Sequence, residues 1–383
     1  MDPTYDVAIC GAGPVGMALA ALLARRGNPG VRIALIDAKP LALAVADPRS
    51  IALSYGSRLM LEEIGAWPVP ATAIHQIHVS RRGQFGRSMI DRVEEDVPAL
   101  GYVTRYGELV TALAAACERA GIDVMRPARV SGHLEHADGI NLKLDGEHNL
   151  GRDLEAALVV QAEGGVFGEQ DTKAVNRDYQ QTAVIARVAA SAPIAHRAYE
   201  RFTDEGPLAL LPQDGADGLQ YALVWCVRPE TAEALLALDD CAFLARLGDA
   251  FGTRLGRFTH TGARASYKLG LNADARATAR TVAIGNAAQT LHPVAGQGLN
   301  LGLRDAAVLA RLLAAGATPG QLAAFAGARQ ADRRTTVGLT DTMARIFTGQ
   351  GPAQALLGLS LGLLDTVAPA RSLLAELMMF GRR

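Results

Sequence analysis

A glycine-rich segment near the start of the chain has the spacing of a phosphate-binding turn. Residues 11–16 read GAGPVG, directly after the apolar run YDVAIC. Gly11 is expected to make the tight turn, and Gly13 to let the backbone approach a pyrophosphate. Gly16 would allow a helix to pack closely on the preceding strand. That helix would offer free N–H groups and the positive end of its dipole to the phosphates.

The segments on either side of this turn complete the pattern. Apolar residues at helical spacing predict a helix that stops at Gly27, and VRIALID, residues 31–37, predicts a second strand. Asp37 at its end can accept hydrogen bonds from both hydroxyls of an adenosine ribose. A coincidental glycine-rich turn explains this order less well than a dinucleotide site does. The pattern by itself does not separate NAD from FAD.

A second glycine-rich segment lies far downstream. Residues 283–305 read AIGNAAQTLHPVAGQGLNLGLRD, and Gly296 and Gly298 bracket a loop before a helix that is predicted to begin near Leu299. A helix N-terminus aimed at the pyrimidine end of a flavin would stabilise the negative charge of the reduced ring. Asn286, which ends a strand, is placed to hydrogen-bond a ribityl chain.

The loop before this helix favours FAD over NAD. Pro293 can form a rigid wall beside a flavin ring. An ordinary NAD dehydrogenase has no use for a second cofactor loop so far from the first. A connection that is merely rich in small residues accounts for neither the density nor the order of these residues. For His292 in this loop and for His78, a structural hydrogen bond is a better explanation than acid–base catalysis.

The composition excludes several other classes of protein. Of the 383 residues, 49% are hydrophobic and 20% charged, with a net charge of −1, so no electrostatic footprint for nucleic acid is present. The four cysteines are scattered, and we expect neither a disulfide framework nor a metal site. No stretch has the pattern of a signal peptide or a spanning helix, so a cytoplasmic location is expected.

The rest of the chain predicts an α/β fold, with a Rossmann-like FAD-binding domain and an inserted β-sheet domain for the substrate. The segments YALVWCV and LALLP have the composition of strands and should roof the flavin with a dry, apolar pocket. The FAD-binding domain would comprise residues 1–75, 100–179 and 269–345. The substrate domain would comprise residues 76–99 and 180–268, and residues 346–383 would form a helical tail.

Several further segments carry a resemblance to a known family. They are DPRSIALS at 47–54, IHVS at 77–80, YERFT at 199–203, GPLALLP at 206–212 and the block at 283–305. With GAGPVG, they resemble the ubiquinone-biosynthesis hydroxylases, which are flavoprotein aromatic monooxygenases with the fold of p-hydroxybenzoate hydroxylase. Most members carry Gly-Asp-Ala-Ala-His where this chain has Gly-Asn-Ala-Ala-Gln. This version is similar to that of the members that act on a 2-polyprenyl-6-methoxyphenol.

The resemblance implies an activity. Reduced FAD would add O2 at its C4a carbon to form a hydroperoxide, which hydroxylates a polyprenylated phenol on the way to ubiquinone. The protein would position the ring and exclude water, and a phenol needs no strong protein base. NAD(P)H would be a transient reductant, because the chain has no second Rossmann repeat. Another FAD-dependent aromatic hydroxylase or reductase, and a non-catalytic FAD-binding subunit of a biosynthetic complex, are the alternatives.

The resemblance also implies roles for residues at matching positions. Arg49 and Arg105 would contact the pyrophosphate or ribose of FAD, although on their own they would be read as surface arginines. The residues around the ADP half would be Gly11, Ala12, Gly13, Pro14, Val15, Gly16, Asp37 and Ala38. Those around the ribityl chain and ring would be Gly285, Asn286, Pro293, Gly296, Gly298, Leu299 and Asn300.

Two further regions bear on the reductant and on the source of the substrate. The family's Ala-Asp-Gly motif, with a Ser and an Arg after it, is here Ala-Glu163-Gly164 without either, which leaves the pyridine nucleotide contact open. The apolar tail, ending in Met378-Met379-Phe380, is expected to be a packed or subunit-contacting helix. Because a prenylated substrate must be drawn from lipid, peripheral contact with a membrane or with a ubiquinone-biosynthesis protein complex is a further expectation.

Overall fold

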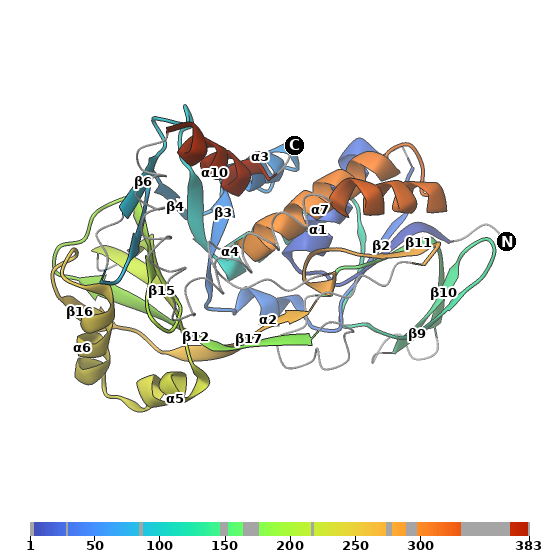
Figure 1. Ribbon diagram of the computed structural model, residues 1–383. Helices are drawn as coiled ribbons and strands as arrows, with labels where there is room; N and C mark the ends of the chain where they lie inside the picture. The colour runs from blue at the N-terminus through green and yellow to red at the C-terminus, as the bar shows by residue number, and fades with distance from the viewer. Residues whose placement is uncertain are drawn as a thin grey trace.

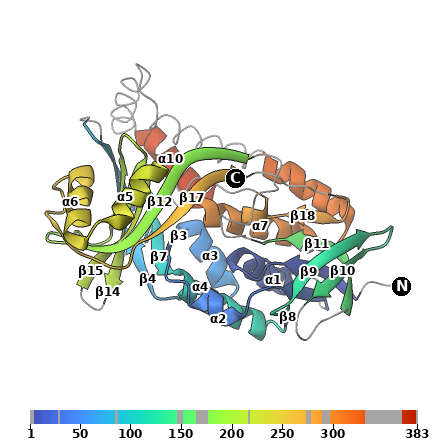
Figure 2. The ribbon, with the colours of Figure 1, turned by 90° about the horizontal axis from the view of Figure 1, so that it is seen from below.

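Three β-sheets organise the described part of the chain, which Figure 1 presents as a ribbon. The computed structural model describes residues 4–27, 30–83, 87–145, 152–163, 176–215, 218–272, 278–288, 297–330 and 368–381. A mostly parallel sheet lies towards one end of the molecule, and a mostly antiparallel sheet, called the antiparallel sheet below, lies towards the other, with a three-stranded sheet between them (Figures 1 and 2).

The first sheet is the predicted dinucleotide-binding core. Strand β1 (Tyr5–Cys10) lies between β2 (Ile33–Ile36) and β11 (Arg152–Gln161) and is parallel to both. Val7, Ala8 and Ile9 are completely buried, as expected for a parallel strand covered on both faces. The other strands are β8 (Asp123–Met125), β9 (Arg129–Glu135), β10 (Ile140–Asp145) and β18 (Thr281–Ala283).

Helices from distant parts of the chain cover this sheet. They are α1 (Pro14–Arg26), α4 (Tyr106–Arg119) and α7 (Gln297–Leu313). Their apolar residues join those of β1, β2 and β11 in one large core. This region also contains α2 (Leu41–Val45), α3 (Tyr55–Glu63) and the 3-10 turn η1 (Gly285–Ala287), and residues 319–330 are helical as well.

The antiparallel sheet has eight described strands in the order β16-β12-β15-β14-β13-β5-β6, with β17 also paired to β12, and of its pairs only β13 with β5 is parallel. Its strands are β5 (Gln76–Arg81), β6 (Arg87–Asp91), β12 (Asn176–Ala190), β13 (Arg197–Phe202), β14 (Pro207–Gly215), β15 (Gly218–Val227), β16 (Phe258–Thr261) and β17 (Ala265–Asn272). Because β12 begins at Asn176 and β17 ends at Asn272, this sheet extends four residues beyond the expected boundaries of 180 and 268 on each side.

Two helices lie in the segment whose sequence suggested mainly strands. They are α5 (Pro229–Ala237) and α6 (Asp240–Phe251). The side chain of Asp239 caps α6 by accepting a hydrogen bond from Ala242 N at 2.8 Å. Their apolar residues, among them Phe243 and Leu247, pack on one face of the sheet. The helical period therefore overrides the β-forming composition around it.

The three-stranded sheet and the last helix join the two larger sheets. Its strands are β3 (Ser50–Ser54), β7 (Gly101–Arg105) and β4 (Ala71–Ile74), and His75 alone separates β4 from β5 of the antiparallel sheet. Helix α10 (Ala368–Phe380) packs on α3, β3 and β6. The rest of the predicted tail lies outside the described residues. No described helix is both long and apolar enough to cross a bilayer.

Candidate functional site

Two glycines of the first motif are required by the fold itself. Gly11 has a φ of +108°, and a Cβ there would lie 2.6 Å from the carbonyl carbon of Ala162. A Cβ at Gly16 would lie 1.9 Å from the carbonyl oxygen of Gly11. No side chain fits at either contact, so both positions hold β1, the turn and α1 together.

Gly13 is different, because its surroundings are open. The nearest atom to a Cβ at this position would be Tyr106 Oη, at 3.8 Å. Gly13 is also the N-cap of α1, where no side chain caps the helix and no acidic residue lies in the first turn. The uncapped N–H groups and the free space fit the pyrophosphate of a dinucleotide cofactor.

Hydrogen bonds hold the side chain of Asp37 against the same turn. Its Oδ2 accepts a hydrogen bond from Ala12 N at 2.7 Å, and its Oδ1 accepts one from Lys39 N at 2.8 Å. Ala38 beside it is exposed. The carboxylate is therefore fixed at the end of β2, next to the glycine turn, where the sequence predicted a partner for ribose.

The second glycine motif meets the first one in space. A Cβ at Gly285 would lie 3.3 Å from both methyl groups of Val15, and one at Gly302 would lie 2.7 Å from Val15 Cγ2 and 3.1 Å from Gly285 Cα. Gly285 also has a φ of +59°, so glycine is favoured here both by the close packing and by the left-handed backbone conformation. The start of α1 and the start of α7 are thus packed together, as one extended cofactor spanning both motifs requires.

A buried ion pair supports the second motif. Asp305 of α7 is completely buried, and its Oδ2 accepts a hydrogen bond from Gly285 N at 3.2 Å. Its Oδ1 accepts one from Arg329 Nε at 2.6 Å, and Arg329 is 4% exposed. The sequence indicated no role for Asp305 and gave no sign of Arg329, because nothing local predicts that two residues 24 positions apart will pair in the core.

Asn300, which the sequence placed beside the flavin ring, uses its side chain to hold α7 in place. Its Oδ1 accepts hydrogen bonds from Ser54 N and Ser57 Oγ, both at 2.8 Å, and its Nδ2 donates to the carbonyl oxygen of Ala52 at 3.0 Å. These bonds join the first turn of α7 to β3 and α3. Gly298 and Leu299 precede it in the same turn and are partly exposed.

The two predicted arginines lie near the first turn but differ in their contacts. Arg49 forms a bidentate pair with Asp47 at 2.7 to 3.0 Å and lies 5.0 Å from the ring centre of Tyr106, whose hydroxyl faces Gly13. Burial alone would raise the pKa of Asp47, but the hydrogen bonds and charge of Arg49 hold it below its ordinary value. Arg105 is exposed and directly precedes α4.

The remaining predicted cofactor residues are only partly described. Glu163 follows β11 and is exposed, and Asn286 is exposed in the turn after β18. Both therefore lie at the carboxyl ends of parallel strands, where ligands of such sheets bind. Gly164, His292, Pro293 and Gly296 lie outside the described residues.

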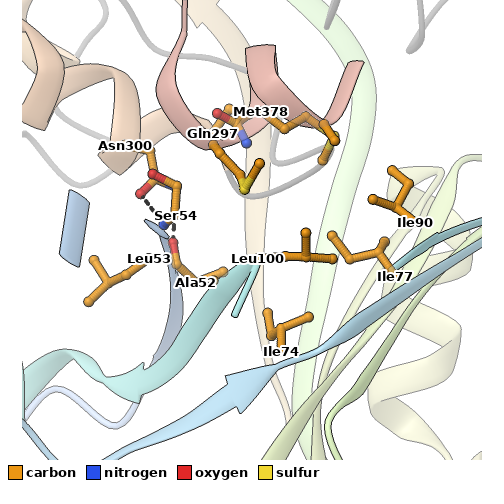
Figure 3. Close-up of a pocket in the computed structure, with 13 residues that line it drawn as sticks. Ala52, Leu53, Ser54, Ile74, Ile77, Ile90, Leu100, Gln297, Asn300 and Met378 are labelled. Atoms are coloured by element: carbon orange, nitrogen blue, oxygen red, sulfur yellow. Dashed lines mark hydrogen bonds between the residues drawn. The ribbon is translucent and has the colours of Figure 1, made fainter. Parts of the chain in front are cut away.

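An apolar pocket opens beside the first turn of α7, as Figure 3 shows. Its volume is about 460 Å³, including its open mouth. Its lining residues are Ala52, Leu53, Ser54, Ile74, Ile77, Ile90, Leu100, Gly101, Gln297, Asn300, Ala375, Met378 and Met379. The described walls thus come from β3 to β7, α7 and α10. The segments YALVWCV and LALLP, which were expected to roof the flavin, lie in β15 and β14 and contribute no residue to this described lining.

Helix α10, which closes the pocket, is held by close contacts. A Cβ at Gly56 would lie 2.7 Å from the carbonyl oxygen of Met379, so glycine lets the two helices touch. The rings of Tyr55 and Phe380 pack edge to face at 6.0 Å. The end of the tail is therefore a packed helix that contributes to the site. Its apolar Met-Met-Phe sequence indicated that the helix would be packed, but it did not indicate that the helix would line this pocket.

His78, the other histidine considered as a catalyst, does not line the pocket. It is 4% exposed, pairs in the sheet with Met89 and Tyr199, and its Nδ1 has no hydrogen-bond partner. Burial, together with the charge of Arg254, lowers the pKa of His78 to about 4. It is therefore a neutral side chain of the sheet.

Acid should destabilise the protein through His78. The unfolded chain binds a proton near pH 6.5 that the folded chain takes up only near pH 4, so stability is lost as the pH falls between these values. We expect a loss of about 1 to 2 kcal/mol between pH 7 and pH 5. Urea unfolding at both pH values measures it, and the His78→Phe variant should lose less. An equal loss in the variant would contradict the prediction.

Comparison with known proteins agrees with this geometry. Residues 4–327 match the FAD binding domain family. The chain is 32% identical to ubiquinone hydroxylase UbiL of Rhodospirillum rubrum, over 97% of this chain and 89% of that protein. It is 29% identical to 3-demethoxyubiquinol 3-hydroxylase of Escherichia coli, over 82% of this chain and 80% of that protein.

The solved structures confirm the predicted fold class. The p-nitrophenol 4-monooxygenase PnpA of Pseudomonas putida superimposes with a TM-score of 0.75 over 100% of both chains, at 18% identity. Fold, glycine motifs and sequence similarity therefore agree. The chain belongs to the FAD binding domain family and, within it, to the flavoprotein aromatic monooxygenases that include the ubiquinone-biosynthesis hydroxylases.

Proposed function

We propose that this protein hydroxylates a polyprenylated phenol of the 2-polyprenyl-6-methoxyphenol type, in the biosynthesis of ubiquinone. The observation that carries the proposal is the apolar pocket beside the first turn of α7, next to the second glycine motif. The relatives named as ubiquinone hydroxylases support the same class of substrate.

The lining of the pocket favours a substrate with a neutral, hydrophobic ring. None of the described lining residues is charged, so a carboxylate on the substrate would find no cation to pair with. Ser54 and Asn300 already bond to each other, and Gln297 is the other polar side chain in the lining. Isoleucine, leucine and methionine side chains would contact a phenol ring or its prenyl chain through apolar surface.

The chain's own residues position the cofactor and keep the site dry. The turn at Gly11 and the uncapped start of α1 would hold the pyrophosphate of FAD, and the start of α7 would face the ring. When bound, FAD supplies the activation of O2 that no side chain can perform. Met378 and Met379 of α10 would exclude water from the reacting ring. NAD(P)H is proposed as the transient reductant.

The direct test is turnover with a defined substrate. The FAD-loaded protein, supplied with NADPH and ¹⁸O2, should convert a short-chain 2-prenyl-6-methoxyphenol to a product that contains one ¹⁸O atom. 4-Hydroxybenzoate should not be converted, because its carboxylate has no partner in the pocket. If NADPH fails, chemically reduced FAD replaces it. No labelled product with reduced FAD would exclude this function.

Filling the pocket should block the reaction without disturbing the cofactor. Ala375 of α10 lines the pocket, and an Ala375→Phe side chain would occupy space meant for substrate. We expect kcat/KM to fall at least about tenfold, or about 1.4 kcal/mol. The absorption spectrum of bound FAD should not change.

Leu373→Phe is the matched control for this variant. Leu373 lies on the same helix but is 59% exposed, so a phenyl ring there meets solvent. Its kcat/KM should stay within about twofold of the unmodified enzyme. Equal losses in the two variants would show that α10 tolerates no aromatic side chain and that the pocket is not the cause.

A further inference from the structure

A second hollow lies at the carboxyl ends of β5 and β13, beside the loop that follows α6. Its lining residues are Arg81, Gly83, Arg201, Phe251, Gly252, Thr253 and Arg254, and we call it the arginine hollow. Its volume is about 890 Å³, and it is open to solvent. It shares no described lining residue with the apolar pocket, so the proposed hydroxylation does not explain it.

Arg201 is held in position without the help of an acid. Its Nε donates a hydrogen bond to the carbonyl oxygen of Ala250 at 3.1 Å, and its Nη1 donates to Ser80 Oγ at 3.4 Å. Both acceptors are neutral, so the bonds fix the guanidinium but leave its charge uncompensated. A Cβ at Gly252, which has a φ of +87°, would lie 3.8 Å from Arg201 Nη2, so no side chain crowds the group from that side.

The positive charges in the hollow and beside it repel one another. Burial lowers the pKa of Arg201, and the charges of Arg254 and Arg82 lower it further. Within the described part of the chain, none of these three arginines forms an ion pair with a carboxylate. The described lining likewise contains no Asp or Glu. In a chain of net charge −1, placing Arg201, Arg254 and Arg82 together without a carboxylate is costly unless an anion neutralises their charge.

We propose that the arginine hollow binds a phosphate group. Guanidinium groups donate two parallel hydrogen bonds to phosphate oxygens, and a phosphate offers enough oxygens for several arginines at once. Arg201 comes from β13 and Arg254 from the loop after α6, so the two donors approach from different elements. The phosphate belongs either to a small soluble molecule or to a phospholipid headgroup.

Binding of a soluble phosphate is tested by calorimetric titration. The FAD-loaded protein is titrated with inorganic phosphate and, separately, with pyrophosphate. Flotation with phosphatidylcholine vesicles, with and without phosphatidic acid, tests the lipid source. Arg254→Gln should weaken whichever binding is seen by at least about tenfold, because a guanidinium–phosphate contact contributes about 1.4 kcal/mol or more. Arg201→Lys, which keeps the charge but loses the paired donors, should also weaken it.

Arg246→Gln is the matched control, since Arg246 is an exposed arginine of α6 that does not line the hollow. It should leave binding unchanged. Binding of phosphate or pyrophosphate that depends on Arg254 supports the proposal with a soluble ligand. Binding to phosphatidic acid vesicles that depends on Arg254 supports it with a lipid. Absence of binding to every probe, or binding that Arg254→Gln and Arg246→Gln leave equally strong, overturns it.

Discussion

Gly13→Ala is expected to leave the apoprotein folded while it weakens FAD binding about a hundredfold. Within the described protein, the added methyl group would meet nothing closer than Tyr106 Oη at 3.8 Å, so folding loses nothing. The same methyl group would stand where the backbone must approach the pyrophosphate. A clash of that kind costs about 3 kcal/mol, or about a hundredfold in Kd. Thermal melting of the apoprotein and fluorescence titration with FAD measure the two effects separately.

Gly16→Ala is the contrasting variant within the same motif. A Cβ at Gly16 would lie 1.9 Å from the carbonyl oxygen of Gly11, so the first turn of α1 cannot keep its place. We expect this variant to be insoluble or unfolded whether or not FAD is present. If Gly13→Ala bound FAD normally, the pyrophosphate would have to lie elsewhere. If its apoprotein melted early, Gly13 would serve the fold instead of the ligand.

Arg329→Met should destabilise the protein by about 3 to 5 kcal/mol, the largest loss that we expect from a single ion pair. The substitution removes the partner of Asp305, whose carboxylate is completely buried and would remain charged in the core. Because Asp305 also accepts the hydrogen bond from Gly285 N, the second glycine motif should loosen as well. Urea unfolding of the apoprotein measures the stability, and retention of FAD through gel filtration measures the motif.

Two variants separate this effect from a general loss of charge. The double variant Asp305→Asn, Arg329→Met should be more stable than Arg329→Met, because no unpaired charge stays buried. Arg26→Met removes a bidentate pair with Glu63 of similar length, at 2.5 to 2.6 Å. Those side chains are 29% and 32% exposed, so we expect a loss of only about 1 kcal/mol or less. Equal losses for Arg26→Met and Arg329→Met would contradict the argument.

The local parts of the cofactor site followed from the sequence. The turn at Gly11, the helix after it and Asp37 lie within one strand-turn-helix-strand unit, where residue type and spacing nearly determine the conformation. The start of α7 was predicted within two residues for the same reason. Helix α6 was missed even though Asp239 is a normal cap, because strand-like neighbours outweighed a short helical pattern.

The pairing of distant segments was decided by tertiary structure alone. The pocket brings Ile77 of β5 and Leu100, just before β7, together with Met379 of α10, and the buried ion pair joins Asp305 to Arg329. Likewise, the side chain of Asn300 had a predicted place beside the ring but is used to join α7 to β3 and α3. Hydrophobic burial is non-directional, so an apolar residue predicts that its side chain will be buried but does not predict which residues it will pack against. Their partners are set by sheet order and helix packing, which depend on the whole chain at once.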